Sequence, residues 1–260
     1  MSDSTSNDMP LLSHLIELRS RLLRSVLVIV VIFVGLAFFA NELYEWLSQP
    51  LKEALPESST LIAIDVTAPL FAPFKLAFVM AIFIAMPFVL HQAWLFISPG
   101  LYKHEKGFAV PLLVSSIILF YAGIAFAYFV IFPIIFSFLS SIGPQDVNYL
   151  PDINSVLSIA LKLFFAFGLA FEIPIATMLL IWSGLVSHEK LSNTRPYMVV
   201  GIFVFAMLLT PPDMISQVLL AIPMWILFEL GLIFARAYSP KKADTHNNND
   251  TNEDTETKNS

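Results

Sequence analysis

Residues 107–145 read GFAVPLLVSSIILFYAGIAFAYFVIFPIIFSFLSSIGPQ and contain no charged side chain. About 20 apolar residues let a helix cross the hydrocarbon core of a bilayer, so this stretch can hold one long membrane helix. The whole chain has the same character, with 57% apolar and 13% charged residues, against roughly 45–50% and 25% in soluble domains. We therefore predict a polytopic membrane protein, which excludes a soluble enzyme, a disordered chain and a DNA-binding domain.

Charged residues delimit five further apolar segments, two before this stretch and three after it. We expect an all-α fold in which residues 25–236 form a six-span membrane domain. The fifth segment has about 15 residues, or about 22 Å of helix, and Pro211, Pro212 and Asp213 then interrupt it. Spans 5 and 6 are therefore predicted to form a tight hairpin. The expected spans are residues 22–41, 68–91, 107–139, 153–183, 196–210 and 214–235.

The positions of the basic residues predict the orientation, because cytoplasmic loops carry an excess of lysine and arginine. With the N-terminus inside, all bases lie on the inner side except Lys52, Lys75 and Lys162. An even number of spans then places both termini in the cytoplasm, and residues 41–65 form an outer loop. The polar residues 237–260 are expected to be a disordered cytoplasmic tail. Lys75 and Lys162 are expected to snorkel toward the outer interface.

The first 24 residues are predicted to be a cytoplasmic segment that contains an amphipathic helix. Residues 1–10 carry two aspartates and no base, which is unlike a cleaved signal peptide, so direct insertion into a bacterial-type plasma membrane is expected. From residue 10 to 24 the leucines recur at helical spacing, and such a helix would lie along the inner surface before turning into span 1. Glu17 can pair with Arg21 one turn away, which is the structural explanation for both residues. The stripe consists of Leu11, Leu15, Leu18 and Leu22.

Two acidic residues stand out beyond this helix. Glu105 lies between two lysines in the loop after Phe96, where a solvated, locally neutralised charge is the simplest interpretation. Glu172 lies deep in span 4, where a charged carboxylate costs about 2.5–3.5 kcal/mol, so a functional role is the default expectation. By contrast, Glu229 lies near the inner end of span 6 and is expected to snorkel.

Several kinds of site are absent from the sequence. There is no cysteine, no nucleotide-binding glycine motif and no zinc-protease motif. The five histidines fall at predicted helix ends or in the tail, so none can pair with a serine inside the membrane. We expect no catalytic residue, no metal site, no cofactor and no enzyme activity.

Four motifs, taken in order on a six-span profile, carry a family resemblance. They are HLIELR at residues 14–19, FISPGLYKHE at 96–105, FEIP at 171–174 and LTPPD at 209–213. Over about residues 11–236 the chain resembles the TatC family of the twin-arginine translocase, a Sec-independent protein translocase.

The resemblance implies that the chain is the receptor and a core component of the translocase in the bacterial inner membrane. It also implies that this translocase exports folded proteins and uses the proton-motive force. It implies that Glu17, Glu105, Phe96 and Arg19 bind the twin-arginine signal peptide at the cytoplasmic face. The implied partners are TatA- and TatB-type single-span proteins, which dock near spans 5 and 6 in a hetero-oligomer with several copies of the chain. No nucleic acid is expected to bind.

Within this interpretation Glu172 has two possible roles. It either bonds a polar group on a partner helix or binds a proton during transport, and the first is favoured because no relay of acids or histidines lines up with it. Two other classes remain open. A proton-coupled small-molecule transporter would suit the buried acid and the prolines within spans, and a membrane scaffold would bind no ligand.

Overall fold

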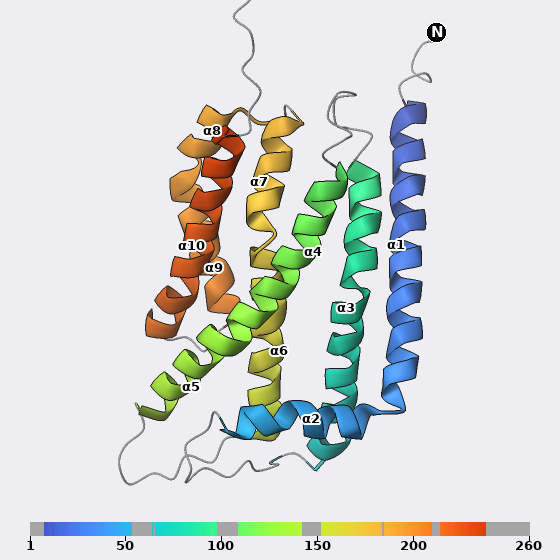
Figure 1. The fold of residues 1–260 in the computed structure, drawn as a ribbon, viewed down its shortest axis with the longest axis vertical. Helices are drawn as coiled ribbons and strands as arrows, with labels where there is room; N and C mark the ends of the chain where they lie inside the picture. The colour runs from blue at the N-terminus through green and yellow to red at the C-terminus, as the bar shows by residue number, and fades with distance from the viewer. Residues whose placement is uncertain are drawn as a thin grey trace, which may run out of the picture.

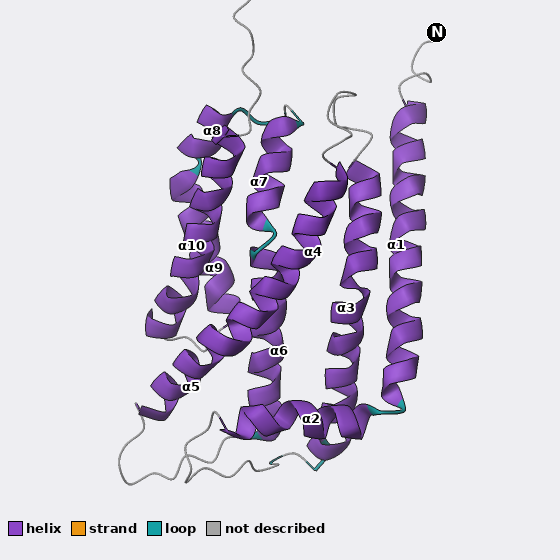
Figure 2. Cartoon of the chain, viewed as in Figure 1, coloured by secondary structure: helices purple, strands orange, loops and turns teal. Residues whose placement is uncertain are grey.

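The computed structural model of the chain describes residues 8–53, 64, 66–97, 109–141, 152–183, 185–209 and 214–237. In these ranges every helix or strand element is a helix (Figure 2), which confirms the all-α prediction. Most helices run roughly along one direction, while α2 lies crosswise at one end and the α4–α5 rod crosses the bundle diagonally (Figure 1). Their bounds are α1 Asp8–Ala37, α2 Ala40–Glu53, α3 Ala68–Ile97, α4 Ala109–Phe126, the π-helix η3 Ala127–Ile131, α5 Phe132–Ser141, α6 Ile153–Ala170, α7 Ile173–Trp182, α8 His188–Asn193, α9 Arg195–Leu209 and α10 Met214–Ala237.

Six apolar helical segments match the six predicted spans. Five are long enough to cross a bilayer, and the sixth, α9, is the short one, with 15 residues. The prediction of a short fifth span is therefore confirmed. The Pro211–Asp213 segment that follows it lies outside the described residues. The five long segments are His14–Ala37, Ala68–Phe96, Val110–Phe138, Asn154–Trp182 and Met214–Arg236.

The predicted turn between an interfacial helix and span 1 is wrong. Helix α1 continues without interruption over 30 residues, from Asp8 to Ala37. Between residues 11 and 34 the sequence has no proline or glycine to break the hydrogen-bond ladder, so the polar first turns simply extend the span. The span also ends earlier than predicted, at residue 37 rather than 41, because the chain turns there and starts α2.

The outer loop predicted at residues 41–65 contains helix α2. It crosses the bundle at the end opposite the N-terminus and packs against α3 (Figure 1). Leu43 and Tyr44 on its inner face pack against the main core, while Trp46 is exposed. This amphipathic helix covers one end of the bundle, which is called the α2 end below. The opposite end, where α1 begins, is called the α1 end.

Two of the long spans are irregular in the middle. In the third, α4, η3 and α5 form one tilted rod with a π-helical segment, where the Phe132 N–H bonds to the Ala127 carbonyl. The fourth span breaks between α6 and α7. There the Glu172 N–H bonds only three residues back, to Leu169, and Pro174 has no N–H to donate. The break places the Glu172 carboxylate at an interruption of the helix, in the interior of the span.

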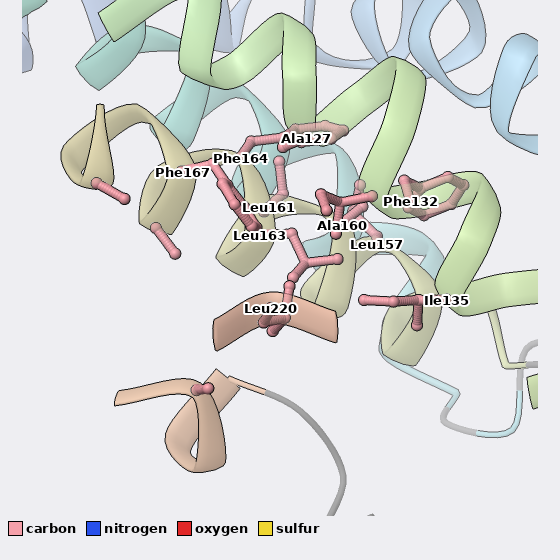
Figure 3. Close-up of a cluster of buried hydrophobic side chains, with 14 of the residues drawn as sticks. Ala127, Phe132, Ile135, Leu157, Ala160, Leu161, Leu163, Phe164, Phe167 and Leu220 are labelled. Atoms are coloured by element: carbon pink, nitrogen blue, oxygen red, sulfur yellow. The ribbon is translucent and has the colours of Figure 1, made fainter. Parts of the chain in front are cut away.

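Close helix crossings fix where that break lies. Helices α4 and α6 approach so closely that a Cβ on Gly168 would lie 2.7 Å from the Phe120 ring. Helices α7 and α10 meet at Gly231, where a Cβ would lie 2.9 Å from the Cα of Pro174. Around these crossings, α5, α6 and α10 bury Phe132, Phe164 and Leu220, among others, in the main core (Figure 3). The small residues let α4 and α10 hold the broken span on both sides.

Candidate functional site

Residues predicted to bind a signal peptide meet at the α1 end of helices α1 and α3. The two helices lie side by side (Figure 1) and pack against each other. The His14 ring stacks on the Phe96 ring, with 4.2 Å between centroids and 21° between planes. Glu17 follows His14 by three residues, so it lies on the same side of α1, one turn further into the helix. The structure thus brings Glu17 and Phe96 to one edge, and His14 joins them.

Glu17 forms an ion pair on its own helix, as the structural explanation predicted. Both the Nε and the Nη2 of Arg21 donate to the same oxygen, Oε1, and the Nε bond is 3.0 Å long. The Arg21 side chain is 19% exposed and that of Glu17 is 40% exposed. No described residue bonds the second oxygen, Oε2, so half of the carboxylate is available to a further donor.

Of the two other residues predicted to bind the signal peptide, the structure describes one and not the other. Arg19 is exposed, and no described residue pairs with it. Glu105 lies outside the described residues. The expected convergence of Glu17 and Glu105 therefore stays a prediction.

Glu172 has a partner that sequence reasoning missed. Ser116 of α4, which is only 1% exposed, donates its hydroxyl hydrogen to Oε2 of Glu172. The other oxygen, Oε1, is buried and has no hydrogen-bond partner among the described residues. The signal in the sequence was the pair Ser115–Ser116, which interrupts the apolar run of span 3. Because Ser116 and Glu172 are 56 positions apart, only the packing of α4 against the helix break brings them together.

A cavity of about 460 Å³ lies next to this hydrogen bond, between α4, α7 and α10. Its wall includes Ser115 and Pro174, which neighbour the bonded pair in sequence, and is otherwise apolar. The remaining lining residues are Pro111, Leu112, Leu119, Ile175, Met178, Trp182 and Phe234. Such a surface can hold an apolar segment, and Ser115 is its polar point.

Glu229 does not merely snorkel, as expected from the sequence. It forms a two-pronged ion pair with Arg195, with Nε–Oε1 at 2.8 Å and Nη2–Oε2 at 2.9 Å. The pair ties the start of the short helix α9 to α10. The sequence did not reveal this pair, because Arg195 and Glu229 lie on different helices, 34 positions apart.

Within the described ranges, no three histidine, aspartate or glutamate side chains gather in a way that could hold a metal ion. The site residues are instead a half-paired carboxylate, a stacked aromatic pair and a buried carboxylate in a broken span.

Comparisons with known proteins identify the family. The family model described as "Sec-independent protein translocase protein (TatC)" matches residues 13–223. The TatC protein of Azotobacter chroococcum is 56% identical over 230 residues, covering 88% of this chain and 90% of that protein. The TatC protein of Escherichia coli K12 is 52% identical over 238 residues and covers 92% of each. A crystal structure of the "Twin Arginine Translocase Receptor- TatC" superposes with a TM-score of 0.78 at 37% identity, covering 86% of this chain and 98% of that one.

These findings agree with the six apolar helices and with the four motifs in the sequence. They assign the chain to protein transport rather than to catalysis, and to a multi-pass place in a bacterial inner membrane. They also set aside the small-molecule transporter and the scaffold as functional classes. The chain belongs to the TatC family of Sec-independent protein translocase proteins.

Proposed function

We propose that this chain is the receptor for twin-arginine signal peptides, and that Glu17, Glu105, Phe96 and Arg19 form the binding site at its cytoplasmic face. The observation that carries the proposal is the junction of α1 and α3, where the His14–Phe96 stack lies one turn from a carboxylate with an open oxygen. The related crystal structure is named a twin-arginine translocase receptor, which supports the proposal.

The chemistry of arginine explains why two carboxylates would form this site. A guanidinium group presents a planar fork that bonds both oxygens of a carboxylate, and the ammonium group of lysine cannot do this. Two hydrogen-bonded charge contacts give about 3–6 kcal/mol. Micromolar binding needs about 8 kcal/mol, so apolar contacts with the rest of the signal supply the remainder. The cavity beside Ser115, which begins at the α1 end of α4, offers one such surface.

Arg21 fits this mechanism as an internal competitor. It occupies only one oxygen of Glu17 and belongs to a partly exposed i,i+4 pair. Such pairs contribute about 0.3–0.5 kcal/mol, so an incoming arginine displaces or shares the contact at little cost.

Binding of a labelled twin-arginine peptide to the purified protein in lipid nanodiscs tests the proposal. The peptide should bind more tightly than its Lys-Lys variant, and Glu17→Gln/Glu105→Gln should remove that preference. Glu189→Gln, which neutralises an exposed glutamate on α8, is the matched control and should leave it unchanged. Equal binding of both peptides, with and without an added TatB-type protein, would contradict the proposal.

The single-span TatA- and TatB-type proteins are proposed to dock on the α9–α10 hairpin. Helix α9 spans about 22 Å, which is shorter than the roughly 30 Å hydrocarbon core. It also presents an exposed apolar face with Tyr197, Val200 and Leu208. A partner helix that packs on this face covers it from lipid and offsets the mismatch. Cross-linking from a photoreactive residue at position 200, compared with one at 118 on α4, tests this placement.

Glu172 is proposed to contact a polar group on such a partner helix rather than to carry protons. One of its oxygens is buried and has no described bond, while the other is held by Ser116. In the bilayer few other donors are available to that oxygen. Transport is proposed to use the proton-motive force, as the resemblance implies. Normal export by Glu172→Gln would count against both the partner-contact and the proton-binding roles.

A further inference from the structure

Two lysines lie close together on neighbouring helices near the α2 end, away from the site described above. Lys75 of α3 donates from its Nζ to the Ser158 hydroxyl of α6. Lys162 lies on α6 one turn beyond Ser158, and residues four apart share a helix face. The side chains of Lys75 and Lys162 are both exposed. Lys75 therefore ends on the face of α6 that also carries Lys162.

Besides these lysines, the α2 end carries acids, among them Glu42 and Glu45 of α2. No described carboxylate forms an ion pair with Lys75 or Lys162. The described acid at this end of α6 is Asp152, whose side chain already caps the helix at Ser155 and accepts from the Ile64 N–H. Two exposed lysines on one face, neither in an ion pair with a described acid, favour binding of an external anion.

The direction of the helices strengthens this preference. Both α3 and α6 begin at the α2 end, so their positive dipole ends point toward that surface. Side chains on a helix lean toward its N-terminus, so both lysine stems lean toward the same membrane surface. Lys75 is about 10 Å and Lys162 about 13 Å from the start of its helix, at 1.5 Å per residue. Both can therefore present their charge near the headgroup level.

The surroundings of the lysines distinguish a lipid from a free ion. Phe78 lies one turn deeper than Lys75 and is 46% exposed, although its ring also contacts Phe33. Phe165 lies one turn deeper than Lys162 and is 39% exposed. Cations near the surface, followed by exposed aromatic rings deeper in, match a molecule with an anionic head and apolar chains.

We propose that Lys75, Ser158 and Lys162 form a binding site for the phosphate group of an anionic phospholipid in the leaflet at the α2 end. Under the predicted topology this is the outer leaflet. The lysines hold the headgroup, and the acyl chains lie along Phe78 and Phe165. The site is independent of signal-peptide binding.

Photocross-linking in nanodiscs of equimolar phosphatidylglycerol and phosphatidylcholine tests the proposal. Photoreactive phosphatidylglycerol should label peptides from residues 71–78 and 158–165 of the wild-type chain, in preference to photoreactive phosphatidylcholine. Each lysine near an anionic lipid contributes about a fivefold preference. Lys75→Gln/Lys162→Gln should therefore lower the preference by about 25-fold, and Lys75→Arg/Lys162→Arg should retain it.

Two controls separate the site from general charge and from folding. Lys190→Gln/Arg236→Gln removes two exposed bases elsewhere and should leave labelling of these peptides unchanged. Lys162→Gln alone keeps the Lys75–Ser158 bond, and should lower the preference by about fivefold. The proposal is overturned if Lys75→Gln/Lys162→Gln and Lys190→Gln/Arg236→Gln change the labelling to the same extent, or if neither variant changes it. Competition by inorganic phosphate as strong as that by short-chain phosphatidylglycerol would also overturn it, because the ligand would then be the free ion.

Discussion

Ser116 and Glu172 share a hydrogen bond across the contact between α4 and the break in the fourth span, 56 residues apart in sequence. The hydroxyl is almost fully buried, and it satisfies one oxygen of a carboxylate whose other oxygen has no described partner. The broken span is thus held by a polar contact in surroundings that are otherwise apolar. Removing the donor and removing the acceptor should have different consequences.

Ser116→Ala should destabilise the protein. It leaves a second buried acceptor oxygen without a partner, which costs about 1–3 kcal/mol. Ser115→Ala is the matched control, because no described hydrogen bond involves Ser115, and it should be nearly neutral. Unfolding in mixed detergent micelles measures both variants. Equal stability of the two would mean that the Ser116–Glu172 contact contributes nothing.

The contact between α7 and α10 predicts that alanine substitutions at two glycines have different effects on the free energy of unfolding. At Gly231 a methyl group would lie 2.9 Å from the backbone Cα of Pro174, which cannot move aside as a flexible side chain could. Gly231→Ala should therefore lower the free energy of unfolding by about 1–3 kcal/mol. At Gly201 of α9 a methyl group would meet nothing within 4 Å, so Gly201→Ala should be neutral or stabilising. The same unfolding assay compares them, and similar losses in both would disprove the crossing argument.

The coupling energy of the Arg195–Glu229 pair should depend on its two parallel hydrogen bonds. Its side chains are 48% and 24% exposed, so a double-mutant cycle should give a coupling of about 0.2–1 kcal/mol that decreases with salt. Arg195→Lys should lose most of this coupling, because lysine cannot bond both oxygens. Exchange of the two residues, Arg195→Glu/Glu229→Arg, should recover part of it. If lysine preserved the full coupling, the fork would be irrelevant.

How much of this could be predicted from the sequence depends on whether a feature is local. The six apolar segments and the 15-residue length of α9 follow from neighbouring residues, and the structure confirms them. The helix in the outer loop was missed, although its apolar positions lie on one side. The continuity of α1 was missed as well, because amphipathic spacing suggested a separate interfacial helix where nothing in the sequence breaks the span.

The paired contacts could not be predicted, for a different reason. Membrane helices are apolar on all sides, so their periodicity does not indicate which face meets which neighbour. Ser116 with Glu172 and Arg195 with Glu229 each join different helices. The motifs and the resemblance identified Glu17 and Phe96, but only the packing of α1 on α3 showed that His14 stacks on Phe96.

Asp152 should make stability depend on acid pH. The hydrogen bond from the Ser155 hydroxyl, with those from the backbone N–H groups of Ile64 and Ser155, holds the pKa of Asp152 below its usual value of 3.8. A carboxylate with a lowered pKa stabilises the folded state above its unfolded pKa, and this contribution disappears as the pH falls through the folded value. Asp152→Asn keeps a capping side chain but should remove this part of the acid dependence below about pH 4. The free energies of unfolding of the wild-type and Asp152→Asn proteins should therefore converge as the pH falls through that range. A constant difference between them would contradict the role assigned to Asp152.

Arg21 should restrain signal binding by competing for Glu17. It bonds one oxygen of that carboxylate, so Arg21→Gln leaves both oxygens available to an arginine of the signal peptide. Loss of an i,i+4 pair worth about 0.3–0.5 kcal/mol should tighten twin-arginine binding by about twofold. Arg24→Gln removes the same charge one turn further along α1, where no described residue pairs with it, and so measures the general electrostatic effect. Peptide titrations in nanodiscs should show that Arg21→Gln binds the Arg-Arg peptide more tightly than Arg24→Gln does. The two variants should bind the Lys-Lys peptide equally, because only a guanidinium group bonds both oxygens of Glu17. Equal affinities for the two variants would mean that Arg21 acts only through its charge, and that Glu17 is as accessible with its internal partner as without it.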